Sequence, residues 1–319
     1  MAIFKFIMRR CALGFLTIFA VSLLIFLVTQ AFPSDPAQVI LGREVTPESL
    51  AALRHELGLD RSSVTQFLDW FFGVLQGNFG KSFVTEMKIS GYIGSRIGNS
   101  LFLMFIGAII SIPLSLLIGS YAALKRDKKF DTISSTTALL AAGIPEFVMG
   151  TALILLLSTT VFHVLPAITL IEEGRQPWSD LTGMVLPVVT LVLSVTPYVS
   201  RTMRASMIEM LESDYVEMAR LKGMPERLVL IRHAFPNALG PVFQVIALNL
   251  AYLAGGTVIV ERLFNYPGVG SALADSVRAR DLPVIQFITL MIAGVYVVTN
   301  LIADVATVLA TPRLRTSLK

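Results

Sequence analysis

Residues 214–236 read DYVEMARLKGMPERLVLIRHAFP, a polar stretch that lies between two long apolar runs. Its helix start and stop signals predict two short helices. Asp214 is a suitable N-cap for the first helix, with Glu217 at N3 completing a capping box, and Gly223 is a suitable residue for its end. Pro225 fits the first turn of a second helix. We therefore expect an ordered element here, not a flexible connector.

The apolar runs around this loop dominate the composition. Of the 319 residues, 54% are hydrophobic and only 15% are charged, so the chain is expected in a bilayer. The net charge of +4 comes from basic residues scattered through short loops, a pattern that favours membrane topology over a nucleic-acid partner. The single cysteine, Cys11, and three widely separated histidines predict neither a disulfide nor a metal site.

A helix needs about 20 apolar residues to cross about 30 Å of hydrocarbon. Five runs free of charged residues reach that length: 11–34, 97–124, 181–200, 234–260 and 282–303. A sixth run, 133–165, is interrupted by Ile144-Pro145-Glu146, and we expect its spanning part to follow Glu146. The first run is longer than the apolar part of a cleaved signal peptide, which predicts a retained span.

Basic residues assign the orientation, because Lys and Arg in short flanks resist translocation. One face of the predicted topology carries sixteen of them and the short loops of the other face carry four, with the long loop 35–96 left out of the comparison. Both termini and the 214–236 loop are therefore expected in the cytoplasm. The fold class expected is an all-α integral membrane protein with six transmembrane helices.

The long outer loop has helix signals of its own. Thr46-Pro47-Glu48 predicts a helix start, and Gly58 predicts its end. A second amphipathic stretch follows at 64–75 and carries four large aromatic residues. These are Phe67, Trp70, Phe71 and Phe72. Two interpretations remain open: the aromatics sit at the membrane interface, or they form a docking platform for a soluble partner.

The cytoplasmic loop resembles the EAA loop of ABC importer permeases, whose pattern is Glu-Ala-Ala-x3-Gly-x9-Ile-x-Leu-Pro. Glu217, Ala219, Gly223 and Pro236 hold the register of that pattern, while Met218, His233 and Phe235 depart from it. The helix signals alone would equally fit an amphipathic helix on lipid headgroups. The register favours the permease interpretation.

Longer stretches resemble the dipeptide, oligopeptide and nickel branch of this family, and the resemblance spans essentially the whole chain. They are GLD at 58–60, GKSF at 80–83, YVEMARLKG at 215–223, VERLFNYPGVG at 260–270 and RDLPV at 280–284. The resemblance implies type I importer permease topology in a bacterial inner membrane. It also implies an N-terminal span with its outer loop (1–95), a permease core (96–310) containing the coupling loop 201–237, and a cytoplasmic tail (311–319).

The resemblance implies a channel-forming subunit of an ATP-driven importer of di- or oligopeptides, with nickel, opine or glycoside uptake as alternatives. Such a subunit is not an enzyme and binds no cofactor. ATP and Mg would be used by two partner ATP-binding subunits, alongside a second homologous permease, giving a heterodimer, and an extracytoplasmic substrate-binding protein. The motif end Gly80-Lys81-Ser82 does not argue otherwise, since a full P-loop needs glycine where Leu75 stands.

Two rival classes stay open. An ion-coupled secondary transporter predicts inverted halves with interrupted helices in corresponding positions, which the sequence does not display. A membrane scaffold without transport is the other.

Three groups of candidate site residues follow. By resemblance, coupling to the ATPase falls to Asp214, Tyr215, Glu217, Ala219, Arg220, Lys222, Gly223 and Pro236. An outer gate that contacts the binding protein falls to Glu261, Phe264, Pro267, Gly268 and Gly270, for which the residues themselves indicate only a tight turn. The translocation-pathway candidates are Glu146, Asn300 and Asp304.

The pathway candidates rest on the cost of an ionisable group in hydrocarbon, about 3 kcal/mol or more. Glu146 either lines a path for a peptide amino group or is a helix-break residue paired with a neighbouring span. Asp304 lies one turn after Asn300 near the inner end of the last span, where that neighbour or interfacial water would satisfy it.

Overall fold

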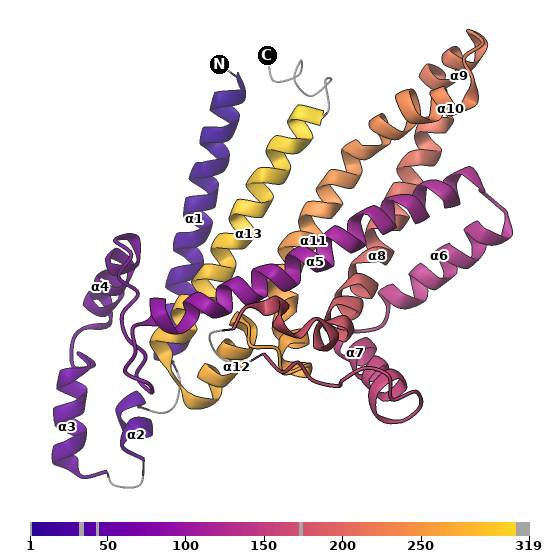
Figure 1. Cartoon of the computed structure of the whole chain (residues 1–319). Coiled ribbons are helices and arrows are strands. Elements are labelled where there is room, and N and C mark those ends of the chain that lie inside the picture. Colours follow the sequence, from indigo (N-terminus) through magenta and orange to yellow (C-terminus); the bar gives the residue numbers. More distant parts are fainter. Residues whose placement is uncertain (1, 32–34, 43–44, 172–174, 311–319) are drawn as a thin grey trace.

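The computed structural model describes residues 2–31, 35–42, 45–171 and 175–310, and the regular structure in these ranges is helical apart from one isolated β-bridge (Figure 1). The helices are α1 (Ala2–Gln30), α2 (Pro36–Leu41), α3 (Pro47–Glu56), α4 (Ser63–Leu75), α5 (Ile89–Leu124), α6 (Lys129–Ala142), α7 (Glu146–Ile154), α8 (Leu181–Leu211), α9 (Asp214–Leu221), α10 (Glu226–Leu228), α11 (Phe235–Leu263), α12 (Val269–Ala279) and α13 (Leu282–Ala310). Three tighter or wider helical turns accompany them: η1 (Leu155–Thr159), η2 (Pro177–Asp180) and η3 (Val229–Ala234).

Five helical segments in the described ranges are long and apolar enough to cross a membrane. They are Ile7–Gln30, Ile89–Leu124, Pro177–Leu211, Glu226–Leu253 and Leu282–Ile302. A sixth candidate is the pair formed by α6 and α7–η1, which is bent by 103°. The all-α membrane fold expected from the sequence is thereby confirmed, with six spans when the bent pair is taken as one.

The expectation that the sixth span follows Glu146 is wrong. After the break, α7 contributes nine helical residues and η1 five, which reach only about 21 Å at 1.5 Å per residue. The stretch before the break, α6, has 14 residues. Pro145 separates the two because it has no N–H to donate and its ring blocks the continuation of α6. The apolar run is therefore shared by two short helices.

The centre of the molecule is built by α5, α8 and α11. At the crossing of α5 and α8, a Cβ on Gly119 would lie 2.4 Å from the carbonyl oxygen of Ser200, so glycine is needed for this close approach. Small residues at such crossings are typical of membrane helices. Side chains on the outer faces are apolar and exposed, as at Leu24, Phe105 and Leu117, which indicates a surface covered by lipid or another chain.

The two ends of the chain run together. α1 packs along α13, and Arg10 of α1 forms a 3.0 Å ion pair with Asp304 of α13. Figure 1 shows the N-terminal end of α1 and the C-terminal end of α13 at the same end of the molecule as α9 and α10, with α2, α3 and α12 at the opposite end. This agrees with termini and loop on one side of the membrane. The predicted tail 311–319 lies outside the described residues.

The outer loop forms the two helices that its sequence predicts. Thr46 caps α3 in a reciprocal capping box with Ser49, and Gly58 follows its end with a left-handed φ of 67°. On α4, Phe67 and Phe71 are buried, and each packs edge-on against a phenylalanine of α1 with ring centroids 5.4 Å apart. These two side chains therefore fix α4 to the first span, which neither interpretation of the aromatics had predicted. Phe72 stays exposed.

Candidate functional site

The cytoplasmic loop begins with α9, whose start differs from the prediction. Ser213 occupies the N-cap position, Asp214 is the first helical residue, and no side chain caps the helix. The hydroxyl of Ser213 donates backwards to the carbonyl of Met210 instead. The predicted capping box between Asp214 and Glu217 is therefore wrong, although both carboxylates lie in the first turn, where negative charge favours the helix.

The end of α9 matches the prediction. Gly223 has a φ of 77°, its N–H donates to the carbonyl of Arg220, and the N–H of Met224 donates to the carbonyl of Ala219. This pair of bonds is a Schellman motif. No heavy atom lies within 4 Å of a Cβ built on Gly223, so the backbone angle requires glycine and the available space does not.

The second predicted helix is not a separate element. Pro225 is an N-cap, not the first helical residue, and α10 passes through the π-helical turn η3 directly into α11. Pro236 lies in the first turn of α11, where its ring would crowd the carbonyl four residues earlier in a regular helix. The wider π-helical turn just before it provides that room. One helical path therefore leads from the loop into the fifth span.

Two side chains of α9 brace the loop from within. The guanidinium of Arg220 donates to the carboxylate of Glu226 at 2.8 and 3.1 Å and to the carbonyl of Leu211 at 3.3 Å. The hydrogen bond with Glu226 raises the pKa of Arg220 above its usual value. The hydroxyl of Tyr215 lies 2.6 Å from Nδ1 of His233. α9 is thus tied to α8, α10 and η3.

α9 has a buried face and an exposed apolar face. Ala219 and Val216 are buried and belong to the same apolar core as Ala234 of η3. The exposed face, called the α9 ridge below, consists of Tyr215, Met218 and Leu221. Of the eight residues predicted for coupling, Ala219 is buried and the others are exposed. An exposed apolar ridge on a braced helix suits contact with a protein partner or with lipid headgroups.

At the other end of the molecule, Glu261 organises the outer turn. It lies beyond the span Glu226–Leu253, is completely buried, and accepts hydrogen bonds from the N–H groups of Gly270 (2.7 Å) and Ser271 (3.2 Å) and the hydroxyl of Ser100 (2.5 Å). The carboxylate thus binds the N-terminal amides of α12. Burial raises the pKa of Glu261 to about 7, although each of these three hydrogen bonds lowers it.

Close packing explains the two glycines of this turn. A Cβ on Gly268 would lie 2.3 Å from Cδ of Glu261, and a Cβ on Gly270 would lie 2.3 Å from Cα of Val258. Any side chain at either position would therefore push α12 away from α11.

Hydrogen bonds to α5 hold the same turn in place. The buried hydroxyl of Tyr266 donates to the carbonyl of Asn99 at 2.8 Å, and the side-chain amide of Asn99 donates to the carbonyl of Pro267 at 2.8 Å. Of the predicted outer-gate residues, Pro267 is half-buried and the others are buried. They shape the turn from inside, while exposed neighbours such as Arg262 and Asn265 form its surface.

Asp281 and Ser82 form a contact that has no local signal in the sequence. Asp281 is buried and accepts hydrogen bonds from the hydroxyl of Ser82 and from the N–H of Phe83, the latter at 3.0 Å. This contact, called the latch below, fastens the outer loop to the start of α13. The segment that resembles a P-loop end therefore has a structural role, and the partners are 199 positions apart.

Asp131 is another buried carboxylate. The apolar runs did not predict its role, because it lies just before the run that starts at 133. Arg204 of α8 binds both of its oxygens, with Nη2 to Oδ2 at 2.6 Å. Asp131 also accepts from the N–H of Asp127 at 3.0 Å. Pairing and hydrogen bonding make a buried charge tolerable, so this pair fixes α6 against α8.

Glu146 is the first residue of α7 and is buried beside the break after α6. Its carboxyl interacts with the hydroxyl of Tyr252 on α11, and its Oε2 has no hydrogen-bond partner in the described part of the chain. The neighbouring Tyr198 donates to the carbonyl of Ala142 at 3.2 Å. The contact with α11 fits the helix-break interpretation, and the free oxygen keeps the pathway interpretation open.

The other two pathway candidates lie elsewhere. Asp304 pairs with Arg10, while the amide of Asn300 donates to the carbonyl of Tyr296 at 2.9 Å. The suggestion that Asn300 satisfies Asp304 is therefore wrong, and the pair with Arg10 supports a structural role at the inner end of the last span. The structure does not bring these two residues together with Glu146.

This fold, with an ordered loop at one end and a clamped turn at the other, is that of a polytopic membrane transport component. The chain belongs to the family of binding-protein-dependent transport system inner membrane components, whose model matches residues 115–316, and the model of the corresponding N-terminal component matches residues 3–104. It is accordingly a multi-pass protein of the bacterial inner membrane.

Relatives are similar along nearly the whole chain. The probable peptide ABC transporter permease protein y4tP of Sinorhizobium fredii is 34% identical, covering 97% of this chain and 99% of the relative. The glutathione transport system permease protein GsiC of Escherichia coli K12 is 34% identical, covering 94% and 95%. A crystal structure of an amino acid ABC transporter shares the fold, with a TM-score of 0.50, 18% identity and coverage of 71% of this chain and 94% of the other.

Proposed function

We propose that this chain is a channel-forming permease subunit of an ATP-driven importer that carries short peptides across the inner membrane. Two observations support the substrate class and the energy source. Relatives similar over the full length are named for peptide and glutathione transport. The α9 ridge, with Leu221 74% exposed on a braced helix, offers a surface to a cytoplasmic protein. This ridge is the observation that carries the proposal.

In this proposal, ATP and Mg are used by two partner ATP-binding subunits, and one of them contacts the α9 ridge of this chain. Movement of that subunit displaces α9 as a rigid body, because the bonds of Arg220 and Tyr215 hold the loop together. The displacement reaches the membrane along α10, η3 and α11, which form one helical path. A stiff connection of this kind transmits motion without local unfolding.

A second, homologous permease completes the path in this proposal. We expect one bundle of this size to be too small to enclose a passage for a peptide, and the exposed apolar faces of α5 offer a surface for another chain. The clamped turn at Glu261 and α12 would then form this subunit's part of the outer gate, where a binding protein delivers the substrate. Glu146, with its free oxygen, is the candidate for contact with a peptide amino group.

Uptake by the reconstituted complex tests the proposal. The permease pair, its ATP-binding subunits and the binding protein are placed in proteoliposomes, and entry of a radiolabelled tripeptide is followed with ATP or with an ion gradient. We expect uptake to require ATP and the ATP-binding subunits. Uptake driven by an ion gradient without them would identify a secondary transporter, and uptake of nickel, an opine or a glycoside in place of peptides would replace the substrate class.

A further inference from the structure

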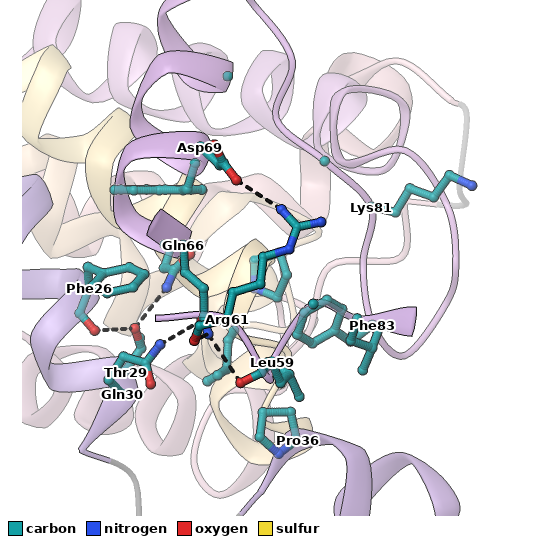
Figure 2. Close-up of a pocket in the computed structure, with 18 of the residues that line it drawn as sticks. Phe26, Thr29, Gln30, Pro36, Leu59, Arg61, Gln66, Asp69, Lys81 and Phe83 are labelled. Atoms are coloured by element: carbon teal, nitrogen blue, oxygen red, sulfur yellow. Dashed lines mark hydrogen bonds and ion pairs between the residues drawn. The ribbon is translucent and has the colours of Figure 1, made fainter. Parts of the chain in front are cut away.

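A cavity of about 860 Å³ lies between the outer end of α1, the outer layer of α2–α4 and the start of α13 (Figure 2). This volume is in the range of small-molecule sites, roughly 300–1,000 Å³. The α9 ridge, Glu146 and the outer turn take no part in its lining. The cavity is thus separate from the coupling loop, from Glu146 and from the outer turn, while Phe83 of the latch forms part of its wall.

The floor of the cavity is fixed by hydrogen bonds between three elements. The side-chain amide of Gln30 on α1 donates to Oε1 of Gln66 on α4 at 2.8 Å. The amide of Gln66 in turn donates to the carbonyls of Leu59 (3.2 Å) and Arg61 (2.9 Å) in the segment between α3 and α4. Figure 2 shows this chain of bonds beneath the side chain of Arg61. A site that is ordered in advance loses little entropy when a ligand binds.

One ion pair in the cavity can open easily. Figure 2 shows Arg61 extending toward Asp69, and Nη1 lies 3.0 Å from Oδ2. The two side chains are 62% and 60% exposed, and an ion pair so close to water contributes at most about 1 kcal/mol. Arg61 has further N–H donors that this contact does not use. A ligand that carries both charges can therefore replace the pair at little cost.

The lining of the cavity as a whole carries both signs of charge. Its acidic members are Asp35, Glu56, Asp60 and Asp69, and its basic members are Arg54, Arg61 and Lys81. Arg54 pairs with Asp35 at 2.5 Å, whereas Lys81 at the rim has no acidic partner in the described part of the chain. A cavity with nearly balanced charge suits a ligand with one positive and one negative end.

We propose that this cavity binds a short zwitterionic peptide, with its C-terminal carboxylate on Arg61 and its N-terminal ammonium on Asp69. The choice of peptides rests on the proposed function. A zwitterionic lipid headgroup carries similar charges, but the apolar lining gives its acyl chains no groove, since Phe26 is buried and Trp70 packs on it with ring centroids 6.4 Å apart. The cavity would therefore be a second peptide site, outside the translocation path.

Direct binding tests the site. The complex of permeases and ATP-binding subunits, without binding protein or ATP, is placed in nanodiscs, and binding of Ala-Ala-Ala, its N-acetyl form and its C-terminal amide is measured calorimetrically. We expect Ala-Ala-Ala to bind and each blocked form to bind up to about fivefold more weakly, as for the loss of one exposed ion pair. Arg61→Gln should weaken binding of Ala-Ala-Ala by a similar factor and binding of the amide hardly at all. Asp69→Asn should do the same with the N-acetyl form.

Arg126→Gln is the matched control, because Arg126 is an exposed arginine that pairs with Glu212 outside the cavity. The control variant should bind Ala-Ala-Ala as tightly as the unchanged complex does. Equal binding of the blocked peptides, or binding unaffected by Arg61→Gln, would overturn the site. So would displacement of peptide by phosphatidylethanolamine but not phosphatidylglycerol, which would assign the cavity to a lipid headgroup. If peptide does not bind here while ATP-dependent uptake continues, this inference fails and the proposed function stands.

Discussion

Gly223 illustrates how a backbone angle restricts one residue. At a φ of 77°, a residue with a Cβ costs about 1 kcal/mol or more, although asparagine tolerates this region better than most. We expect Gly223→Ala to loosen the end of α9 and to lower ATP-driven uptake several-fold, with Gly223→Asn retaining more. Uptake by the two variants, with complex assembly checked by gel filtration, measures this. Equal activity of Gly223→Ala and the unchanged chain would show that the Schellman motif is unimportant for coupling.

Glu261 predicts a dependence of stability on pH. Its pKa is about 7 in the folded chain and 4.5 in the reference state, so between these values the folded state holds the proton more tightly. The contribution of Glu261 to the free energy of unfolding is therefore fully present below about pH 4.5. It is lost as the pH rises to about 7, which lowers the stability by roughly 3 kcal/mol, and above that pH it does not change further.

The melting temperature between pH 5 and 8 measures this effect. We expect it to fall as pH rises in the unchanged chain and to depend much less on pH in Glu261→Gln, which cannot ionise. Identical pH profiles for the two proteins would mean that Glu261 does not titrate in this range.

At the scale of single elements, a substitution in the α9 ridge should weaken assembly with the ATP-binding subunits without disturbing the fold. Leu221 is 74% exposed, so Leu221→Asp should leave the fold intact while removing an apolar contact worth about 1–3 kcal/mol to a partner. We expect the yield of co-purified ATP-binding subunits to drop about tenfold or more.

The control for this prediction is Val64→Asp on α4, which is 69% exposed and lies on a helix far from α9 (Figure 1). It should leave the yield of co-purified subunits unchanged. If both variants assemble normally, the ridge is not the contact surface.

The pair of Asp131 and Arg204 should show strong coupling between two helices. Arg204→Ala leaves a buried carboxylate without its partner, which costs about 3–5 kcal/mol. The double variant Asp131→Ala/Arg204→Ala removes that charge as well and should be more stable than Arg204→Ala alone. A double-mutant cycle on the free energy of unfolding measures this, and additive effects would contradict it.

Signals from nearby residues predicted some element ends correctly and others wrongly. The signals Thr46 and Gly58 correctly bound α3, and Gly223 correctly ends α9, because caps and left-handed turns are local. The capping box at Asp214 failed because the N-cap position lies one residue earlier, at Ser213. The separate second helix failed because a π-helical turn let the chain pass Pro236 without a break.

At the scale of the whole molecule, the latch between Ser82 and Asp281 should hold the outer layer on the membrane core. Ser82→Ala removes one buried hydrogen bond, worth about 1 kcal/mol, which corresponds to roughly a fivefold change in an opening equilibrium. We expect amide hydrogen exchange in α3, α4 and the 78–88 segment to rise about fivefold, while exchange in α8 stays the same. Uniformly faster exchange would show that the residue stabilises the entire fold.

The number of spans and the shared side of the termini could be predicted because apolar length and basic flanks are properties of single segments. The partners of buried charges could not. Asp281 finds Ser82, Asp304 finds Arg10 and Asp131 finds Arg204 through packing of helices far apart in the chain. A single sequence shows that each charge is costly in an apolar setting, but not which helix faces it.

The packing of α1 on α13 bears on how the chain is made. α1 leaves the ribosome long before its main neighbour, α13, so during much of synthesis the first span has lipid in place of that partner. The first span has the highest mean hydropathy of the five unbroken spans, 2.7, and only 17% of its most apolar stretch is buried in the finished fold. A span this apolar is released stably by the translocon before Asp304 arrives to meet Arg10.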